Sequence, residues 1–171
     1  RAVIGGVATR YQAGLVRGKS GKLGWAGQGD EAALASEWLA MLHAQGVDFT
    51  LAWRRLADAA AGNDLLLEAL FPDPPPLRDW LARWRDRCDR DGESAAASRA
   101  QRMRRANPWI IARNHRVEEA LTAASERDDL VPFERLLAAL RNPFEELPEY
   151  AAYAVPAPVA VTAGYQTFCG T

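Results

Sequence analysis

The stretch LRDWLARWRDRCDR, residues 77–90, decides the fold class of this chain. Its apolar residues return every three or four positions, which places them on one face of a helix, while charged residues take the opposite face. The apolar residues are Leu77, Trp80, Leu81, Trp84 and Cys88. The stretch therefore predicts an amphipathic helix that buries both tryptophans, with Cys88 as a small packed residue of the same face.

The segments before this stretch repeat the same period. Asp30 and Asp48 each precede an amphipathic run, as N-cap residues do. The expected inward residues are Leu34, Trp38, Met41 and Leu42 on the first run, and Phe49, Ala52, Trp53 and Leu56 on the second. Helices are also predicted over residues 8–23 and 64–70. The run FPDPPP, residues 71–76, predicts a stiff spacer that is neither helix nor strand.

Two further helices are predicted after residue 98. Pro108 follows Asn107, which predicts an N-cap and a helix over residues 109–124. A second apolar period predicts a helix over residues 130–140. The expected inward residues are Ile110, Ile111, Asn114, Val117, Ala120 and Leu121 on the first, and Leu130, Phe133, Leu136, Leu137 and Leu140 on the second.

The predicted fold is all-α, a compact helical bundle. A helical part is expected over residues 1–90 and C-terminal helices over residues 99–150. Between them, the alanine- and serine-rich residues 91–98 predict a mobile linker. Residues 151–171 are predicted to form an extended tail, because the prolines of residues 155–158 interrupt helix.

Composition excludes several classes of protein. A chain of 171 residues can bury one core, and its apolar runs fall far short of the roughly 20 residues that a membrane span needs. Two cysteines and no secretory signal predict a reducing compartment, the cytoplasm. Neither a membrane nor a disulfide framework is expected.

The charge is distributed unevenly. Residues 78–116 hold eleven arginines against five acidic residues, whereas residues 117–171 hold three arginines against nine acidic residues. The basic stripe could bind nucleic acid. Pairing with the chain's own carboxylates is favoured, because no nucleic-acid-binding motif is present. No nucleic-acid partner is therefore predicted.

Motif-like fragments are interpreted as chance matches. Residues 5–6, GG, lack the spacing of a phosphate-binding loop; residues 48–50, DFT, and 89–91, DRD, imitate kinase motifs without the required neighbours. His43 stands alone. Asn114 and His115 are interpreted as a hydrogen-bonded structural pair, because one histidine is a weak metal signal.

Cys169 is the one candidate site residue, a redox or regulatory thiol. It is third from the last residue and follows a proline-rich run, which would place its sulfur on an extended arm. The alternative is an ordinary half-buried cysteine or part of a frayed terminus. Composition leaves both open.

Several short segments carry a family resemblance. They are residues 22–24, KLG; 47–51, VDFTL; 103–114, MRRANPWIIARN; 140–144, LRNPF; and 148–150, PEY. In this order, and before a terminal Cys-Gly-Thr, they resemble the C-terminal part of the selenoprotein O family. The resemblance covers most of the chain and is strongest from residue 103 onward.

The resemblance implies a protein-kinase-like fold that binds ATP with Mg²⁺ or Mn²⁺ and transfers AMP to Ser, Thr or Tyr hydroxyls of proteins. That chemistry needs a lysine, arginines and carboxylates around the phosphates. This chain lacks the family's β-rich lobe that holds them, so no catalytic, cofactor-binding or metal-binding residue is expected in it. The nucleotide site is expected upstream of Arg1, and the isolated chain is expected to be inactive.

The resemblance also implies partners: protein substrates of the parent enzyme, and the kinase-like core of the same polypeptide, against which the terminal helices would pack. In the family the third-to-last residue is selenocysteine or cysteine and can pair with a cysteine of the activation-loop region. Cys169 occupies that position, and its partner would lie outside this chain. The alternative is a non-catalytic helical interaction or regulatory module.

Overall fold

The computed structural model describes residues 18, 21–25, 31–90 and 96–162. Within these residues all regular secondary structure is helical, which confirms the predicted all-α class. The predicted cap at Asp30 and most of the predicted helix over residues 8–23 lie outside the described residues. The chain divides into two compact units, residues 1–108 and 109–171.

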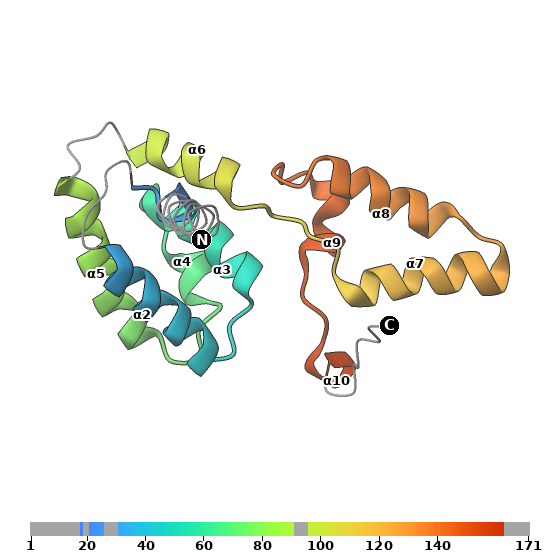
Figure 1. The fold of residues 1–171 in the computed structure, drawn as a ribbon, viewed down its shortest axis with the longest axis horizontal. Helices are drawn as coiled ribbons and strands as arrows, with labels where there is room; N and C mark the ends of the chain where they lie inside the picture. Colours follow the sequence, from blue (N-terminus) through green and yellow to red (C-terminus); the bar gives the residue numbers. More distant parts are fainter. Residues whose placement is uncertain (1–17, 19–20, 26–30, 91–95, 163–171) are drawn as a thin grey trace, which may run out of the picture. The chain divides into compact units, whose positions relative to one another are not determined.

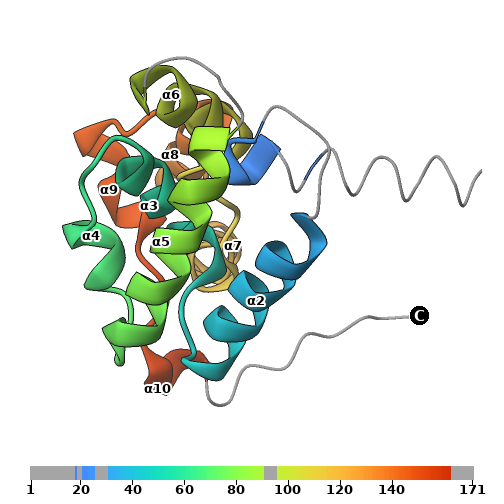
Figure 2. The same cartoon turned by 90° about the vertical axis from the view of Figure 1, so that its left-hand side faces the viewer.

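The first unit is a bundle of helices. Its elements are α2 (Glu31–Ala44), α3 (Phe49–Ala60), α4 (Leu65–Glu68), α5 (Pro74–Arg90) and α6 (Ala96–Ala106). α2 lies beside α5, as Figure 2 shows, and α3 packs against both α4 and α6 (Figure 1). Their apolar faces meet in one core that also includes Leu23 and Trp25.

Trp38 is fully buried at the centre of this core. Its ring centroid lies 4.8 Å from that of Trp80, 5.7 Å from that of Trp53 and 6.0 Å from that of Phe71. Trp84 stacks on Trp80 at 6.0 Å with an interplanar angle of 10°. Aromatic pairs at these separations add to the stabilisation that burial alone supplies. One aromatic cluster therefore joins three helices, α2, α3 and α5, with Phe71 of the segment between α4 and α5.

The inward face predicted over residues 77–90 is confirmed, since all five apolar residues are buried. The indole N–H groups of Trp80 and Trp84 donate to the backbone oxygens of Leu34 and Leu23, both at 3.0 Å. Phe49 was wrongly predicted as inward. It is 54% exposed and touches the core at its edge, with its ring 5.9 Å from that of Trp53.

The predicted cap of α3 is confirmed. The backbone N–H of Leu51 donates to a carboxylate oxygen of Asp48 at 2.8 Å, which satisfies one of the free donors of the first helical turn.

The proline-rich run does not form the predicted spacer, because α5 begins at Pro74. Prolines suit a first helical turn, where the missing N–H would have no acceptor and φ is already helical. The start of α5 is further held by Gln45, whose side-chain amide donates to the oxygen of Asp73 and accepts from its N–H, both at 3.0 Å.

Gly24 offers a test of the packing between the start of this unit and α6. Its φ is +77°, and a Cβ there would lie 2.7 Å from Sδ of Met103 and 2.8 Å from Cγ of Arg99. Gly46 has a similar φ of +63° with no heavy atom within 4 Å of such a Cβ. Both alanine variants carry the cost of a left-handed backbone.

We expect Gly24→Ala to lower the free energy of unfolding by about 1–3 kcal/mol more than Gly46→Ala, because it adds a clash inside a packed core. Urea denaturation followed by circular dichroism measures both variants. Equal losses would show that Met103 does not press against Gly24.

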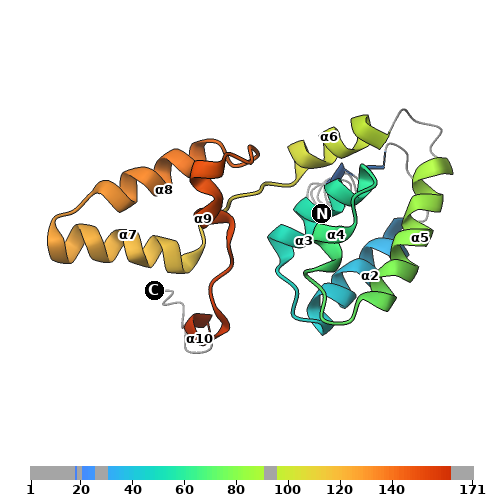
Figure 3. The same cartoon turned by 180° about the vertical axis from the view of Figure 1, so that it is seen from behind.

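The second unit contains a helical hairpin and shorter segments. Its elements are α7 (Asn114–Arg127), α8 (Val131–Arg141), the 3₁₀ helix η1 (Pro148–Tyr150), α9 (Ala151–Ala154) and α10 (Val159–Thr162). α7 and α8 lie side by side and antiparallel (Figure 1, Figure 3). Asp128, in the left-handed region at φ 52°, ends α7 and turns the chain toward α8.

α7 begins at Asn114, and not at residue 109 as predicted. The Asn107 side chain is not a helix cap, because it is fully buried and bonded to Lys22. The N–H groups of Trp109 and Ile110 donate to the backbone oxygen of Pro143 at 2.7 and 3.1 Å. These bonds hold the segment before α7 in a non-helical path.

Two predicted boundaries also differ from the structure. α6 begins at Ala96, so the last residues of the predicted linker 91–98 are helical, in keeping with the helix preference of alanine; residues 91–95 lie outside the described residues. The segment 151–171, predicted to be extended, contains α9 and α10 in its described part. Pro158 directly precedes α10, and its oxygen accepts from the N–H of Val161 at 2.9 Å.

Candidate functional site

The C-terminal end of α6 is held by cationic side chains of other segments. The last backbone oxygens of a helix have no partner within it. Arg54 of α3 donates through Nη1 to the oxygens of Arg104 and Asn107, at 2.9 and 3.1 Å, and Nζ of Lys22 donates to the oxygen of Ala106 at 3.4 Å. Positive charge at this end also interacts favourably with the negative end of the helix dipole. Arg54 and Lys22 therefore cap α6.

Asn107 joins Lys22 to this end of α6. Its Oδ1 accepts from Nζ of Lys22 and its Nδ2 donates to the backbone oxygen of Lys22, both at 3.0 Å. The Nζ also lies 5.6 Å from the centroid of the Trp53 ring. Burial lowers the pKa of the Lys22 amine from its ordinary value of 10.5. The fold thus tolerates a half-buried cation by giving it two oxygen acceptors and an aromatic face.

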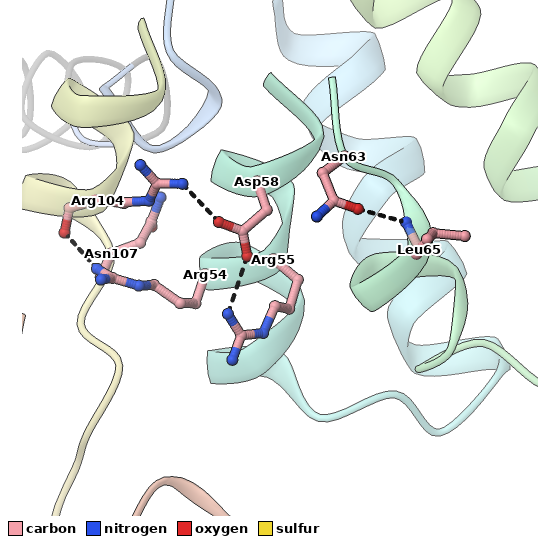
Figure 4. Close-up of polar contacts among 7 residues, drawn as sticks. All are labelled: Arg54, Arg55, Asp58, Asn63, Leu65, Arg104 and Asn107. Carbon is pink, nitrogen blue, oxygen red and sulfur yellow. Dashed lines mark hydrogen bonds and ion pairs between the residues drawn. The ribbon is translucent and has the colours of Figure 1, made fainter. Parts of the chain in front are cut away.

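Asp58 completes the arrangement. As Figure 4 shows, its carboxylate lies between Arg104 and Arg55, accepting from Nη2 of the first at 2.7 Å and from Nη1 of the second at 2.9 Å. The side chain of Asp58 is nearly buried, so these charge-assisted bonds are needed to offset its desolvation. We call Lys22, Arg54, Asp58, Arg104 and Asn107 the cap network.

The cap network was not predicted from the sequence. Arg54 and Asp58 stand four residues apart on the buried face of α3, and this spacing of opposite charges within an apolar period was the available signal. In the structure their polar groups are directed at oxygens and nitrogens of the same unit. The network positions α6 against α3.

An open pocket of about 440 Å³ lies in the second unit. It is lined by Arg116, Glu119, Pro132, Arg135, Glu149, Tyr150, Ala152 and Tyr153. Arg116 donates to Glu119 at 2.8 Å and to the oxygen of Ala152 at 3.0 Å, and its guanidinium lies 5.9 Å from the centroid of Tyr153. Two arginines face two glutamates, so the lining favours neither an anion nor a cation.

The predicted site residue Cys169 lies outside the described residues. Cys88 is 1% exposed, which confirms its predicted role as a packed residue of α5.

The predicted pair of Asn114 and His115 is not formed. Asn114 is exposed and His115 is half-buried, and no hydrogen bond joins the two in the described part of the chain. Asn114 is the first residue of α7, where its side chain faces solvent.

His115 is expected to titrate below its ordinary pKa of 6.5, because burial disfavours its charged form and the neighbouring Arg116 and Arg113 repel it. The unfolded chain then takes up a proton at a higher pH than the folded chain does. The contribution of His115 to stability should therefore be complete above pH 6.5 and decline as pH falls below that value. An NMR titration of the His115 ring checks this, and a midpoint at or above 6.5 would contradict it.

The basic stripe is largely used within the fold. Arg99 donates to the oxygen of Cys88 at 2.8 Å and Arg104 pairs with Asp58. These contacts support the prediction of internal pairing, while the absence of a nucleic-acid partner stays a prediction.

Two of the kinase-like fragments have structural roles. Asp48 is the cap of α3, and Arg90 of the 89–91 run donates to the oxygen of Asp86 at 3.2 Å along the surface of α5. Residues 5–6 lie outside the described residues.

The described ranges contain no helix long and apolar enough to cross a membrane. They also contain no group of three or more His, Cys, Asp or Glu residues placed to hold a metal ion.

Comparison with known proteins identifies the family. The sequence model described as "Protein adenylyltransferase SelO" matches residues 7–141, more than three quarters of the chain. The chain belongs to the SelO family. The match runs through all helices of the first unit and ends with α8, and it confirms the resemblance carried by the short segments.

Bacterial proteins are similar in sequence to this chain over almost its whole length. "Protein nucleotidyltransferase YdiU" of Chromobacterium violaceum is 47% identical over 174 residues, covering 99% of this chain and 35% of the relative. Proteins of the same name are 44% identical in Rhodopseudomonas palustris and 47% identical in Cereibacter sphaeroides, covering 35% and 34% of their lengths. The chain therefore spans about a third of the length of these relatives.

Proposed function

We propose that this chain is the C-terminal helical part of a protein adenylyltransferase that transfers AMP from ATP to Ser, Thr or Tyr hydroxyls of proteins. The observation that carries the proposal is the SelO family match over residues 7–141. The printed names of the relatives, protein nucleotidyltransferases, point to the same chemistry.

The cap network does not fit ATP with Mg²⁺ or Mn²⁺. Transfer of AMP from ATP needs cationic groups directed at the phosphates and carboxylates directed at the metal. In the cap network Arg54 and Lys22 are instead directed at backbone oxygens of α6, and Asp58 is held by two guanidinium groups. We therefore place the nucleotide site in the part of the longer polypeptide that precedes this chain.

In this proposal the chain supplies a scaffold. The aromatic cluster around Trp38 and the cap network give the first unit a defined shape, onto which a kinase-like core of the same polypeptide would pack. Protein substrates would bind to the enzyme formed by this chain and the kinase-like core. The enzyme would be located in the cytoplasm.

A chimera tests the proposal. The segment of the Chromobacterium violaceum relative that matches this chain is replaced by residues 1–171, and AMP transfer to an acceptor protein is measured by mass spectrometry. We expect the chimera to keep the activity of the unaltered relative, and the same chimera with Arg54→Leu to lose much of it with its fold. A chimera that is folded by circular dichroism yet inactive would contradict the scaffold role.

We further propose Cys169 as a regulatory thiol of the complete enzyme, based on the resemblance of residues 169–171, Cys-Gly-Thr, to the cysteine-containing segment of the selenoprotein O family. Cys169→Ser should abolish the response of AMP transfer to oxidants and leave the activity under reducing conditions nearly unchanged. Cys88→Ser, at the other cysteine, is the matched control. An oxidant response that survives in Cys169→Ser would remove this role.

A further inference from the structure

We draw no further inference here: the strongest candidate, the open pocket of the second unit lined by side chains of α7, α8, η1 and α9, presents two arginines and two glutamates, and nothing in the described residues shows what would occupy it.

Discussion

Replacing Trp38 with alanine is expected to lower the free energy of unfolding of the first unit by about 3–5 kcal/mol. Trp38 is 0% exposed, and its ring contacts those of Trp53, Phe71 and Trp80. The substitution removes the apolar surface of the ring and leaves a cavity that three fixed aromatic side chains cannot fill by small shifts. Chemical denaturation followed by far-ultraviolet circular dichroism measures the loss without relying on tryptophan fluorescence.

Phe49→Ala is the matched control for this prediction. Phe49 is also aromatic and also contacts Trp53, but it is 54% exposed. Its removal should cost much less than the removal of Trp38. A similar loss for the two variants would mean that Trp38 is not at the centre of the core.

Arg54→Leu is expected to destabilise the first unit by about 3 kcal/mol, because two backbone oxygens then lose a charged donor. Arg54 is 3% exposed, and the oxygens of Arg104 and Asn107 both accept from its Nη1. Leucine fills part of the space but cannot donate. Arg54→Lys keeps the positive charge, but one ammonium group cannot reproduce the hydrogen-bond geometry of a planar guanidinium. The free energy of unfolding of this variant should therefore lie between those of the unaltered protein and Arg54→Leu. The same denaturation experiment ranks the three proteins.

Arg83→Leu serves as the control for the cap network. Arg83 donates to Glu37, but both side chains are about half exposed, and pairs of this kind contribute little. If Arg83→Leu were as damaging as Arg54→Leu, the capping of α6 would not be the source of the effect.

The sequence predicted the parts of the fold that depend on local periodicity. Residues 77–90 show this most clearly, because a helix with five apolar residues on one face buries them by turning that face toward the core. The cap at Asp48 was predictable for a similar reason, since the acceptor and the donor of Leu51 are three residues apart.

The errors arise where a distant partner decides the local structure. Asn107 and Pro108 have the pattern of a helix start. In the structure, however, the side chain of Asn107 donates to the backbone oxygen of Lys22, and the next N–H groups donate to the backbone oxygen of Pro143. A prediction from neighbouring residues cannot include Lys22, which is 85 positions from Asn107 in the sequence. The start of α7 at Asn114 follows from these contacts.

Periodicity also identifies an apolar face without identifying what covers it. Leu121, Phe133 and Leu137 were predicted as core residues and are half exposed. The prediction of an amphipathic face was correct, but the partner of that face does not lie within the hairpin itself. The candidate site shows the same limit, since Arg54 and Asp58 stand on a predicted helix whose long-range partners could not be predicted.

The intact mass of an acceptor protein after incubation with ATP and Mg²⁺ or Mn²⁺ shows whether residues 1–171 hold the nucleotide site. The complete polypeptide and residues 1–171 alone are compared side by side. We expect the complete polypeptide to add AMP to the acceptor and residues 1–171 alone to add none. Addition of AMP by residues 1–171 alone would contradict the placement of the nucleotide site outside this chain, and no addition by either protein would contradict the proposed activity.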